Sequence, residues 1–273
     1  MAAQSSESAE IDPIFPPELE RYIFELAAGD DIGMALELTL VSKRLQLWME
    51  SIIYYTVTLS SINVCSLFLR AVDSRPASFF ATNVKSLCIP GDIPLKDAMR
   101  IITVCQGVVN LAYWIDHAQP PPPFSYLSSL QPERLSMNIH GLCGSTDHIV
   151  DFHHPFFAMV THLEIVDWSF SLSGYEHLPC LTHLAVDIDQ YSSVLVERLQ
   201  HILESCPQLR VLLCLMSDED MAFDAAEALS RENDADCRLL VMFDFDPISQ
   251  WQVRQWNFAD AVVAANRNSR QLS

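Results

Sequence analysis

Histidine and acidic side chains are the residues of this sequence best suited to chemistry, and several gather in one irregular stretch, residues 141–157. That stretch holds Asp147, His148, Asp151, His153 and His154. Imidazole nitrogens and carboxylate oxygens are ligands that zinc takes in proteins. No HxxxH or HExxH spacing places two of them on one helical face, so a metal site has little support in the sequence.

The motifs of common enzyme classes are missing from the sequence. It contains no GxSxG, no GxxxxGK[ST] and no GxGxxG. Its seven glycines are too few for the phosphate loops of most nucleotide enzymes. Its nine histidines can still meet an acidic residue in space, which a sequence does not exclude. We expect a protein that is not an enzyme and that uses no cofactor.

The cysteines do not favour disulfide or metal chemistry. They are Cys65, Cys88, Cys105, Cys143, Cys180, Cys206, Cys214 and Cys237. None forms a CxxC pair, and most fall at apolar positions of the repeat described below. We therefore expect reduced, buried thiols that pack as small apolar side chains.

Polar residues that alternate with apolar ones along short segments are better candidates for binding. Side chains at alternate strand positions share one face, and adjacent strands lie about 4.8 Å apart, so such residues form one patch. The acidic members would attract a Lys/Arg-rich segment of a target protein. Acidic residues that serve only solubility are the alternative. The set expected to bind a target is Trp114, Asn138, His162, Glu164, Asp167, His183, Asp187 and Asp189.

These candidates lie within a repeat. The pattern apolar-x-x-apolar-x-apolar starts at residues 54, 84, 108, 132, 160, 181, 209 and 237, with a weaker copy at 132. Val160–Ile165 (VTHLEI) is echoed by Leu181–Val186 (LTHLAV). The intervals of 21–30 residues are in the range of leucine-rich repeats, which these segments resemble. The asparagine of the consensus turn is missing, and the repeat lengths vary.

Helices are expected between the strands. Ser60 or Ser61, Asp92 with Pro94, Ser192 or Ser193, and Ser217–Asp220 can each begin one. The last of these helices would bury Met221, Ala225 and Leu229. Strands joined by crossover helices pair in parallel, so we expect a parallel sheet with its strands on a concave face and its helices outside.

The C-terminal segment has a separate role in this prediction. Val211, Leu213 and Leu215 are unusually apolar for an exposed strand face. Apolar strand faces are normally covered. We expect a capping helix that contains Trp256 and ends near Ala265 to cover them, in preference to a bound partner.

The N-terminal part reads as a helical hairpin. Pro16 and Pro17 suit a first helical turn, where the backbone N–H groups have no intrahelical partner. The helix would end at Gly29, and a second helix would run from about Met34 through Leu47. Two short apolar helices do not bury all their apolar side chains alone, so the hairpin needs a partner surface.

Two short motifs in this hairpin resemble the anchor motifs of the F-box. They are Pro16-Pro17-Glu18-Leu19 and Leu40-Val41-Ser42-Lys43-Arg44, with Phe15 in place of leucine and Ser42 in place of cysteine. The resemblance implies docking on the Skp-type linker subunit of a cullin–RING ubiquitin ligase, with the repeats holding a target protein. The implied docking residues are Pro16, Pro17, Glu18, Leu19, Ile23, Leu26, Leu40, Val41, Lys43 and Arg44. A scaffold or inhibitor whose hairpin only caps its own repeats is the alternative.

The net charge and the composition of the N-terminus narrow the classes of partner and of cellular location that remain. A formal net charge of −19 argues against nucleic acid or an anionic membrane as partner. No run is long and apolar enough for a membrane span, and the first residues lack a signal-peptide layout. We expect a cytoplasmic or nuclear protein.

The expected fold is α/β, with an F-box-like helical module, a leucine-rich-repeat-like solenoid and a C-terminal helical cap. The expected boundaries are a disordered tail at 1–10, the module at 11–53, the repeats at 54–247, the capping helix at 248–265 and a loose tail at 266–273.

Overall fold

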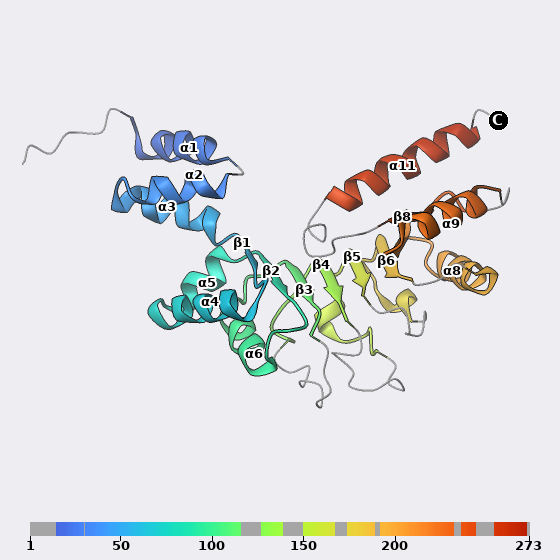
Figure 1. Ribbon diagram of the computed structural model, residues 1–273, viewed down its shortest axis with the longest axis horizontal. Coiled ribbons are helices and arrows are strands. Elements are labelled where there is room, and N and C mark those ends of the chain that lie inside the picture. Colours follow the sequence, from blue (N-terminus) through green and yellow to red (C-terminus); the bar gives the residue numbers. More distant parts are fainter. Residues whose placement is uncertain are drawn as a thin grey trace, which may run out of the picture. The chain divides into compact units, whose positions relative to one another are not determined.

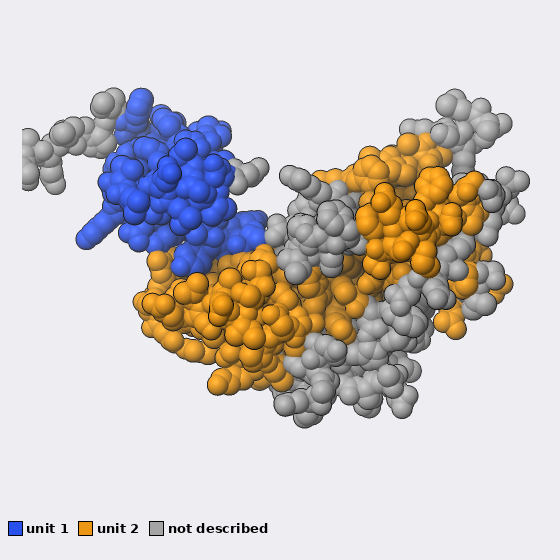
Figure 2. Space-filling model, viewed as in Figure 1, with its two compact units in different colours: residues 1–56 blue, residues 57–273 orange. Residues whose placement is uncertain are grey.

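The computed structural model describes residues 15–29, 31–115, 127–138, 150–166, 174–188, 192–231, 236–243 and 254–271. The chain divides into two compact units, Met1–Thr56 and Val57–Ser273 (Figure 2). We call them the helical unit and the sheet unit. The expected boundary between residues 53 and 54 lies close to the observed one.

The helical unit consists of α1 (Pro17–Ala28), α2 (Ile32–Thr39) and α3 (Lys43–Ile53). Ala28, Ala35 and Met49 form its buried centre, one from each helix. Partly buried side chains surround them: Phe24, Leu38, Trp48, Ile52 and Ile53. Gly29 ends α1 at a φ of 49°, a conformation that favours glycine. The predicted stop at this glycine is confirmed.

The predicted single helix from Met34 through Leu47 is wrong, because two helices occupy this stretch. Ser42 has extended backbone angles, and its Oγ accepts a hydrogen bond from the Leu45 amide at 3.2 Å. A serine in this position satisfies an amide that has no intrahelical partner and begins a new helix. Asp31 caps α2 in the same way, accepting from the Gly33 amide at 2.8 Å.

Within the described residues, the sheet unit is built on one eight-stranded sheet whose order follows the chain, β1 to β8 (Figure 1). The strand pairings from β2 to β8 are all parallel. The strands are β1 (Thr56–Thr58), β2 (Ser86–Ile89), β3 (Asn110–Tyr113), β4 (Arg134–Met137), β5 (His162–Ile165), β6 (His183–Asp187), β7 (Val211–Met216) and β8 (Leu239–Phe243). The α/β class and the parallel sheet are as predicted.

The strand register follows the apolar pattern from β2 to β7. Leucines at the second apolar position pair from strand to strand: Leu87, Leu111, Leu135, Leu163, Leu184 and Leu212. All six are buried, and we call their side of the sheet the leucine face. The weaker copy at residue 132 is confirmed, since Leu135 pairs with both neighbours.

The register expected for the last strand is wrong by one residue. The pattern aligned Leu240 with Leu212, whereas Leu239 pairs with Leu212 in the structure. A slip of one residue moves every side chain of a strand to the other face. Residues 239–243 are apolar throughout, so apolar alternation does not specify their register. The Leu212 amide, which donates to the Arg238 carbonyl at 2.8 Å, fixes it instead.

The connections contain helices of unequal length. They are α4 (Ile62–Ser74), α5 (Ala77–Asn83), α6 (Leu95–Val104), the short 3-10 turns η2 (Pro155–Phe157) and η3 (Tyr175–His177), α8 (Ser193–Ser205) and α9 (Glu219–Arg231). Figure 1 shows α4, α5 and α6 together on one side of the sheet. Ser61 and Ser192 cap α4 and α8 as predicted. Met221 of α9 is exposed, contrary to prediction, while Ala225 and Leu229 are buried.

The C-terminal helix, α11 (Arg254–Gln271), packs on the sheet face opposite the leucine face. Its side chains cover Val211, Leu213 and Leu215, so the predicted capping role is confirmed. The expected end near Ala265 was too early. No glycine or proline interrupts residues 266–271, and their polar types have ordinary helix propensity, so the helix continues through most of the predicted loose tail.

None of the helices in the described parts of the chain combines the length and the apolar character needed to cross a membrane.

Deletion of leucine-face side chains should destabilise the sheet unit. Leu163 and Leu184 have no exposed surface. We expect Leu163→Ala or Leu184→Ala to lower the free energy of unfolding by about 2–5 kcal/mol, because each leaves a cavity in the core. Chemical denaturation measures the change. Leu67→Ala on α4 removes an exposed leucine and should change stability by less than about 0.5 kcal/mol. Equal effects for all three variants would contradict the register.

Candidate functional site

The residues predicted to bind a target lie mainly on the sheet face opposite the leucines. Arg134, His162 and His183 pair across β4, β5 and β6. Ser136 and Glu164 pair one step further along the same face. We call this side of β4–β6 the histidine face. The prediction that these strand positions share one face is confirmed.

The histidine face is not the open acidic surface expected from the sequence. Trp114, Glu164 and His183 are buried, and Asn138, His162 and Asp187 are half-buried. The other two members of the predicted set, Asp167 and Asp189, lie outside the described residues. Strand alternation predicted which side these residues occupy, but alternation does not say what packs on that side.

Trp114 has a structural role on this face. Its Nε1–H donates to Ser136 Oγ at 2.7 Å, and its ring packs with Cys88, Ala112 and Val166. A buried indole with a satisfied N–H contributes packing area and fixes the neighbouring strands. A target protein would therefore meet little of this side chain.

The centre of the histidine face is a stacked pair of imidazoles. The rings of His162 and His183 lie 4.1 Å apart between centroids, with 7° between their planes. The stack follows from the echo in the sequence, since Thr161-His162 and Thr182-His183 occupy equivalent places on neighbouring strands. Strand spacing of about 4.8 Å brings equivalent rings into contact.

The threonines beside the histidines set the imidazole tautomers. The Thr161 hydroxyl donates to the Glu133 carbonyl at 2.9 Å, and the Thr182 hydroxyl donates to the Thr161 carbonyl at 3.1 Å. Each hydroxyl oxygen also lies 2.8 Å from Nδ1 of the following histidine. Because each hydroxyl hydrogen is already used, Nδ1–H must be the donor to that oxygen. The neutral rings therefore carry their lone pair on Nε2.

Helix α11 closes over this pair. The Trp256 ring meets His162 and His183 edge-on, at centroid distances of 5.3 and 5.6 Å. Asp260 Oδ1 lies 3.2 Å from His183 Nε2. Since neutral His183 presents a lone pair at Nε2, this contact becomes attractive only when the imidazole is protonated.

Burial governs the protonation of both rings. Burial lowers the pKa of His162 to about 3, helped by the charges of His183 and Arg134 and opposed by Asp260. Burial also lowers the pKa of His183, against the raising effect of its hydrogen bond to Asp260, and Arg210 and Arg134 lower it further. Both imidazoles are therefore neutral near pH 7.

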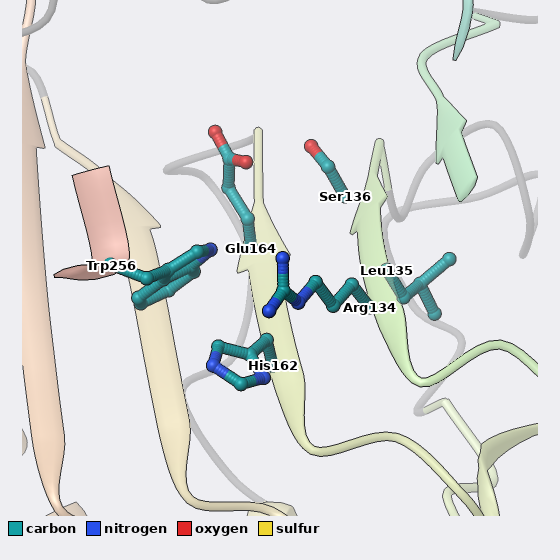
Figure 3. Close-up of a pocket in the computed structure, with 6 residues that line it drawn as sticks. All are labelled: Arg134, Leu135, Ser136, His162, Glu164 and Trp256. Carbon is teal, nitrogen blue, oxygen red and sulfur yellow. The ribbon is translucent and has the colours of Figure 1, made fainter. Parts of the chain in front are cut away.

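A small pocket borders the pair (Figure 3). It is lined by Arg134, Leu135, Ser136, His162, Glu164 and Trp256. Figure 3 shows the Arg134 side chain reaching from β4 toward His162 and Trp256. The free volume is about 10 Å³, close to the least that one water molecule needs. Small-molecule sites usually offer about 300–1,000 Å³. This pocket is too small for a substrate.

The described part of the irregular stretch forms local turns. Asp151 Oδ1 accepts from the His153 amide, and His154 Nδ1 accepts from the Phe156 amide. Asp147 and His148 lie outside the described residues. Across the residues that the structure describes, no group of three or more His, Cys, Asp or Glu side chains is arranged to hold a metal ion.

The cysteines of the described residues are free thiols. Burial raises the pKa of Cys88, Cys105 and Cys214 to about 12, with Glu164 adding to the effect at Cys88. The thiolate is the reactive form, so these thiols are unreactive near neutral pH. Cys143 lies outside the described residues.

The predicted docking residues lie on the surface of the helical unit. Leu19 and Ile23 of α1 are 52% and 47% exposed, and Leu40 and Val41 between α2 and α3 are 86% and 67% exposed. Leu26 is exposed as well. Pro16, Pro17, Glu18 and Lys43 are also exposed. The sequence pattern predicted that these side chains lie outside the core of a short hairpin. Their exposure is consistent with that prediction.

Two features of this surface were not foreseen. The Arg44 guanidinium, expected to contact the linker subunit, donates to Glu20 Oε1 at 2.6 Å within the unit. Tyr22 is an exposed apolar side chain that the motif did not include. It lies three positions after Leu19, and helical spacing alone places both on one side of α1.

The chain matches no protein-family model, and no curated protein matches it. Its resemblance to the F-box and to leucine-rich repeats therefore stays a prediction.

The imidazoles of His162 and His183 should make the stability of the sheet unit fall in acid. Their pKa values lie below the ordinary value when folded, so the unfolded chain binds protons first as the pH falls below about 6.5. Between pH 7 and pH 5 we expect His162→Gln to lose less stability than wild type, by on the order of 1 kcal/mol, which is less than the full pKa shift would give because solvent partly screens the half-buried ring. Denaturation at several pH values measures this difference.

His201→Gln provides the control, because His201 is exposed on α8. Its pH profile should follow that of wild type. If His162→Gln shows the wild-type profile as well, the imidazole of His162 does not contribute to the acid sensitivity.

Proposed function

We propose that this chain is a substrate-recognition adaptor of an SCF-type cullin–RING ubiquitin ligase. Its helical unit docks on the Skp-type linker subunit, and its sheet unit binds the protein to be ubiquitinated. Ubiquitin transfer is carried out by other subunits, so the chain itself needs no catalytic site and no cofactor.

The exposed apolar side chains of the helical unit carry this proposal. Leu19 belongs to the first anchor motif, and Ile23 follows that motif. Leu40 and Val41 belong to the second. All four stand outside the core formed around Ala28, Ala35 and Met49. Exposed apolar patches on small units mark surfaces that bind another protein. Burial of each such side chain against a partner contributes about 1.5–3 kcal/mol.

Charged residues border these apolar side chains. Glu18 of the first anchor and Lys43 of the second are exposed. An apolar centre with a polar rim is the usual composition of a specific protein interface. The Arg44–Glu20 hydrogen bond joins α3 to α1 and orients the two anchors within the unit.

The architecture of the sheet unit gives general support to the proposal that this unit binds the target protein. Its parallel strands follow the chain order, and each repeat contacts its neighbours through the leucine face. Stacked repeats of this kind offer extended surfaces for protein partners. The expected basic segment in the target depends partly on Asp167 and Asp189, outside the described residues, and stays a prediction.

The alternative is a scaffold or inhibitor whose helical unit only caps its own chain. The same four apolar side chains would then be covered by the chain itself rather than by a linker subunit. Binding to that subunit distinguishes the two functions.

Docking should require the apolar anchors. We expect wild type to be captured by the Skp-type linker subunit on co-expression, and Leu19→Asp with Leu40→Asp to reduce capture at least tenfold. An interface would bury both new carboxylates without a partner, which is costly. Both positions are exposed in the free unit, so the variant should keep its fold. Pull-down measures capture by the linker subunit, and circular dichroism of each purified chain measures whether its fold is kept.

Leu67→Asp is the matched control, because Leu67 is a leucine of α4 with 59% exposure that belongs to neither anchor. It should be captured like wild type. Capture of the double variant at the wild-type level, or no capture of wild type, would contradict the ligase proposal and favour the scaffold.

A further inference from the structure

Helix α1 turns its larger apolar side chains away from the core of the helical unit. Of its twelve residues, only Ala28 is buried, and Phe24 is partly buried against the same core. Four large apolar side chains are exposed instead: Leu19, Tyr22, Ile23 and Leu26. An amphipathic helix of a self-contained unit normally directs its apolar stripe inward. The opposite arrangement in α1 indicates that a second surface covers this stripe.

The four exposed side chains form one continuous stripe. Consecutive members are three, one and three positions apart, which a helix of 3.6 residues per turn places on one side. Leu26 lies two positions from both Phe24 and Ala28, so it points about 160° away from each of these core residues. We call the four residues the α1 stripe.

Tyr22 is the member of the α1 stripe that no anchor motif assigns. Leu19, Ile23 and Leu26 are implied as docking residues by the F-box resemblance, whereas Tyr22 is not. The side chain of Tyr22 is 58% exposed, more than that of Leu19 or Ile23. A single exposed aromatic residue needs no explanation, but one within a continuous apolar stripe belongs to an interaction surface.

The size of a specific interface also requires residues beyond the anchor motifs. Such an interface contains roughly 20–30 residues on each side. The anchor motifs imply fewer, and one of these, Arg44, donates to Glu20 within the unit. Further residues must contribute, and Tyr22 continues the same surface, three positions after Leu19 and four before Leu26.

The side chain of tyrosine sets two requirements on a surface that covers it. Its ring supplies a large apolar area, and tyrosine is enriched among the residues that dominate binding energy. Its hydroxyl needs a hydrogen-bond partner once it is buried. A surface that covers Tyr22 must therefore combine an apolar recess for the ring with a polar group for the hydroxyl.

We propose that Tyr22 is a specificity-determining docking residue. Its ring enters an apolar recess of the Skp-type linker subunit, and its hydroxyl forms a hydrogen bond with a polar group in that recess. This inference rests on the proposed function, because it adds a contact to the same docking surface. An apolar side chain of similar size would fill the recess but leave the polar group of the linker subunit without a partner, which weakens binding.

The affinity of the purified full-length chain for a recombinant Skp-type linker subunit, measured by biolayer interferometry, tests the proposal. We expect Tyr22→Ala to weaken binding by about tenfold or more, because the ring and the hydroxyl are both lost. Tyr22→Phe keeps the ring and should weaken binding by about threefold, because only the hydrogen bond is lost.

Neither substitution should disturb the fold of the helical unit. Tyr22 is exposed, and alanine has the highest helix propensity, so α1 should be kept in Tyr22→Ala. Circular dichroism and thermal denaturation of each chain check this. Tyr22→Phe, which changes one atom, provides a second folded variant.

Tyr55→Ala is the matched control, because Tyr55 is a tyrosine of the same unit with 51% exposure that lies outside α1. It should bind the linker subunit with the affinity of wild type. The chain with Leu19→Asp and Leu40→Asp is the reference for loss of docking.

Wild-type affinity of a folded Tyr22→Ala chain, together with lost binding of the Leu19→Asp, Leu40→Asp chain, would overturn this inference and leave the proposed function standing. Equal losses for Tyr22→Ala and Tyr55→Ala would count against it too. Equal affinity of Tyr22→Phe and wild type would refute the hydrogen bond of the hydroxyl.

Two further outcomes identify other failures. No binding of wild type would overturn the proposed function, and this inference with it. A wild-type dimer that Tyr22→Ala converts to a monomer, detected by size-exclusion chromatography with light scattering, would assign the α1 stripe to a second copy of the chain and overturn the inference.

Discussion

The pairing of leucine with leucine across successive strands is the constraint on which the sheet unit depends. From Leu87 to Leu212, each strand places its leucine beside that of the next. A shift of one residue in any strand would move these side chains to the opposite face and expose them. The position of every residue on the histidine face follows from this register. The stacked imidazoles exist because Leu163 and Leu184 pair, which brings the preceding histidines into contact.

Much of this arrangement could be predicted from the sequence, for a physical reason. Strand positions alternate in burial, so the repeated apolar pattern specified both the pairing and the face of most residues. The prediction was wrong where that alternation is missing, in the uniformly apolar β8. It was wrong again near Ser42, where a single side-chain hydrogen bond ends one helix and begins another within an apolar run. A hydrogen bond made by one side chain thus overrides the single helix that the apolar periodicity predicts.

The burial of the candidate site was harder to predict than its position. The polar types of His162, Glu164 and His183 favoured an exposed face, yet His183 and Glu164 are buried. Their burial depends on packing that does not follow from strand alternation. The helix Arg254–Gln271 contributes Trp256 to this face, and it lies far along the chain from His162. In the sequence, the threonine before each histidine was a feature that could have indicated burial of the imidazole. Its hydroxyl satisfies Nδ1, as expected of a buried imidazole.

The two units present their apolar surfaces in different ways, and the difference bears on function. In the helical unit, Leu40 and Val41 remain exposed because three short helices enclose only a small core. In the sheet unit, Leu213 and Leu215 are fully covered by α11. An exposed apolar surface is available to a partner, whereas a covered one stabilises its own unit by keeping apolar side chains away from water. The docking step of the proposed function therefore rests on the exposed side chains of the helical unit, and the covered side chains of β7 serve the stability of the sheet unit.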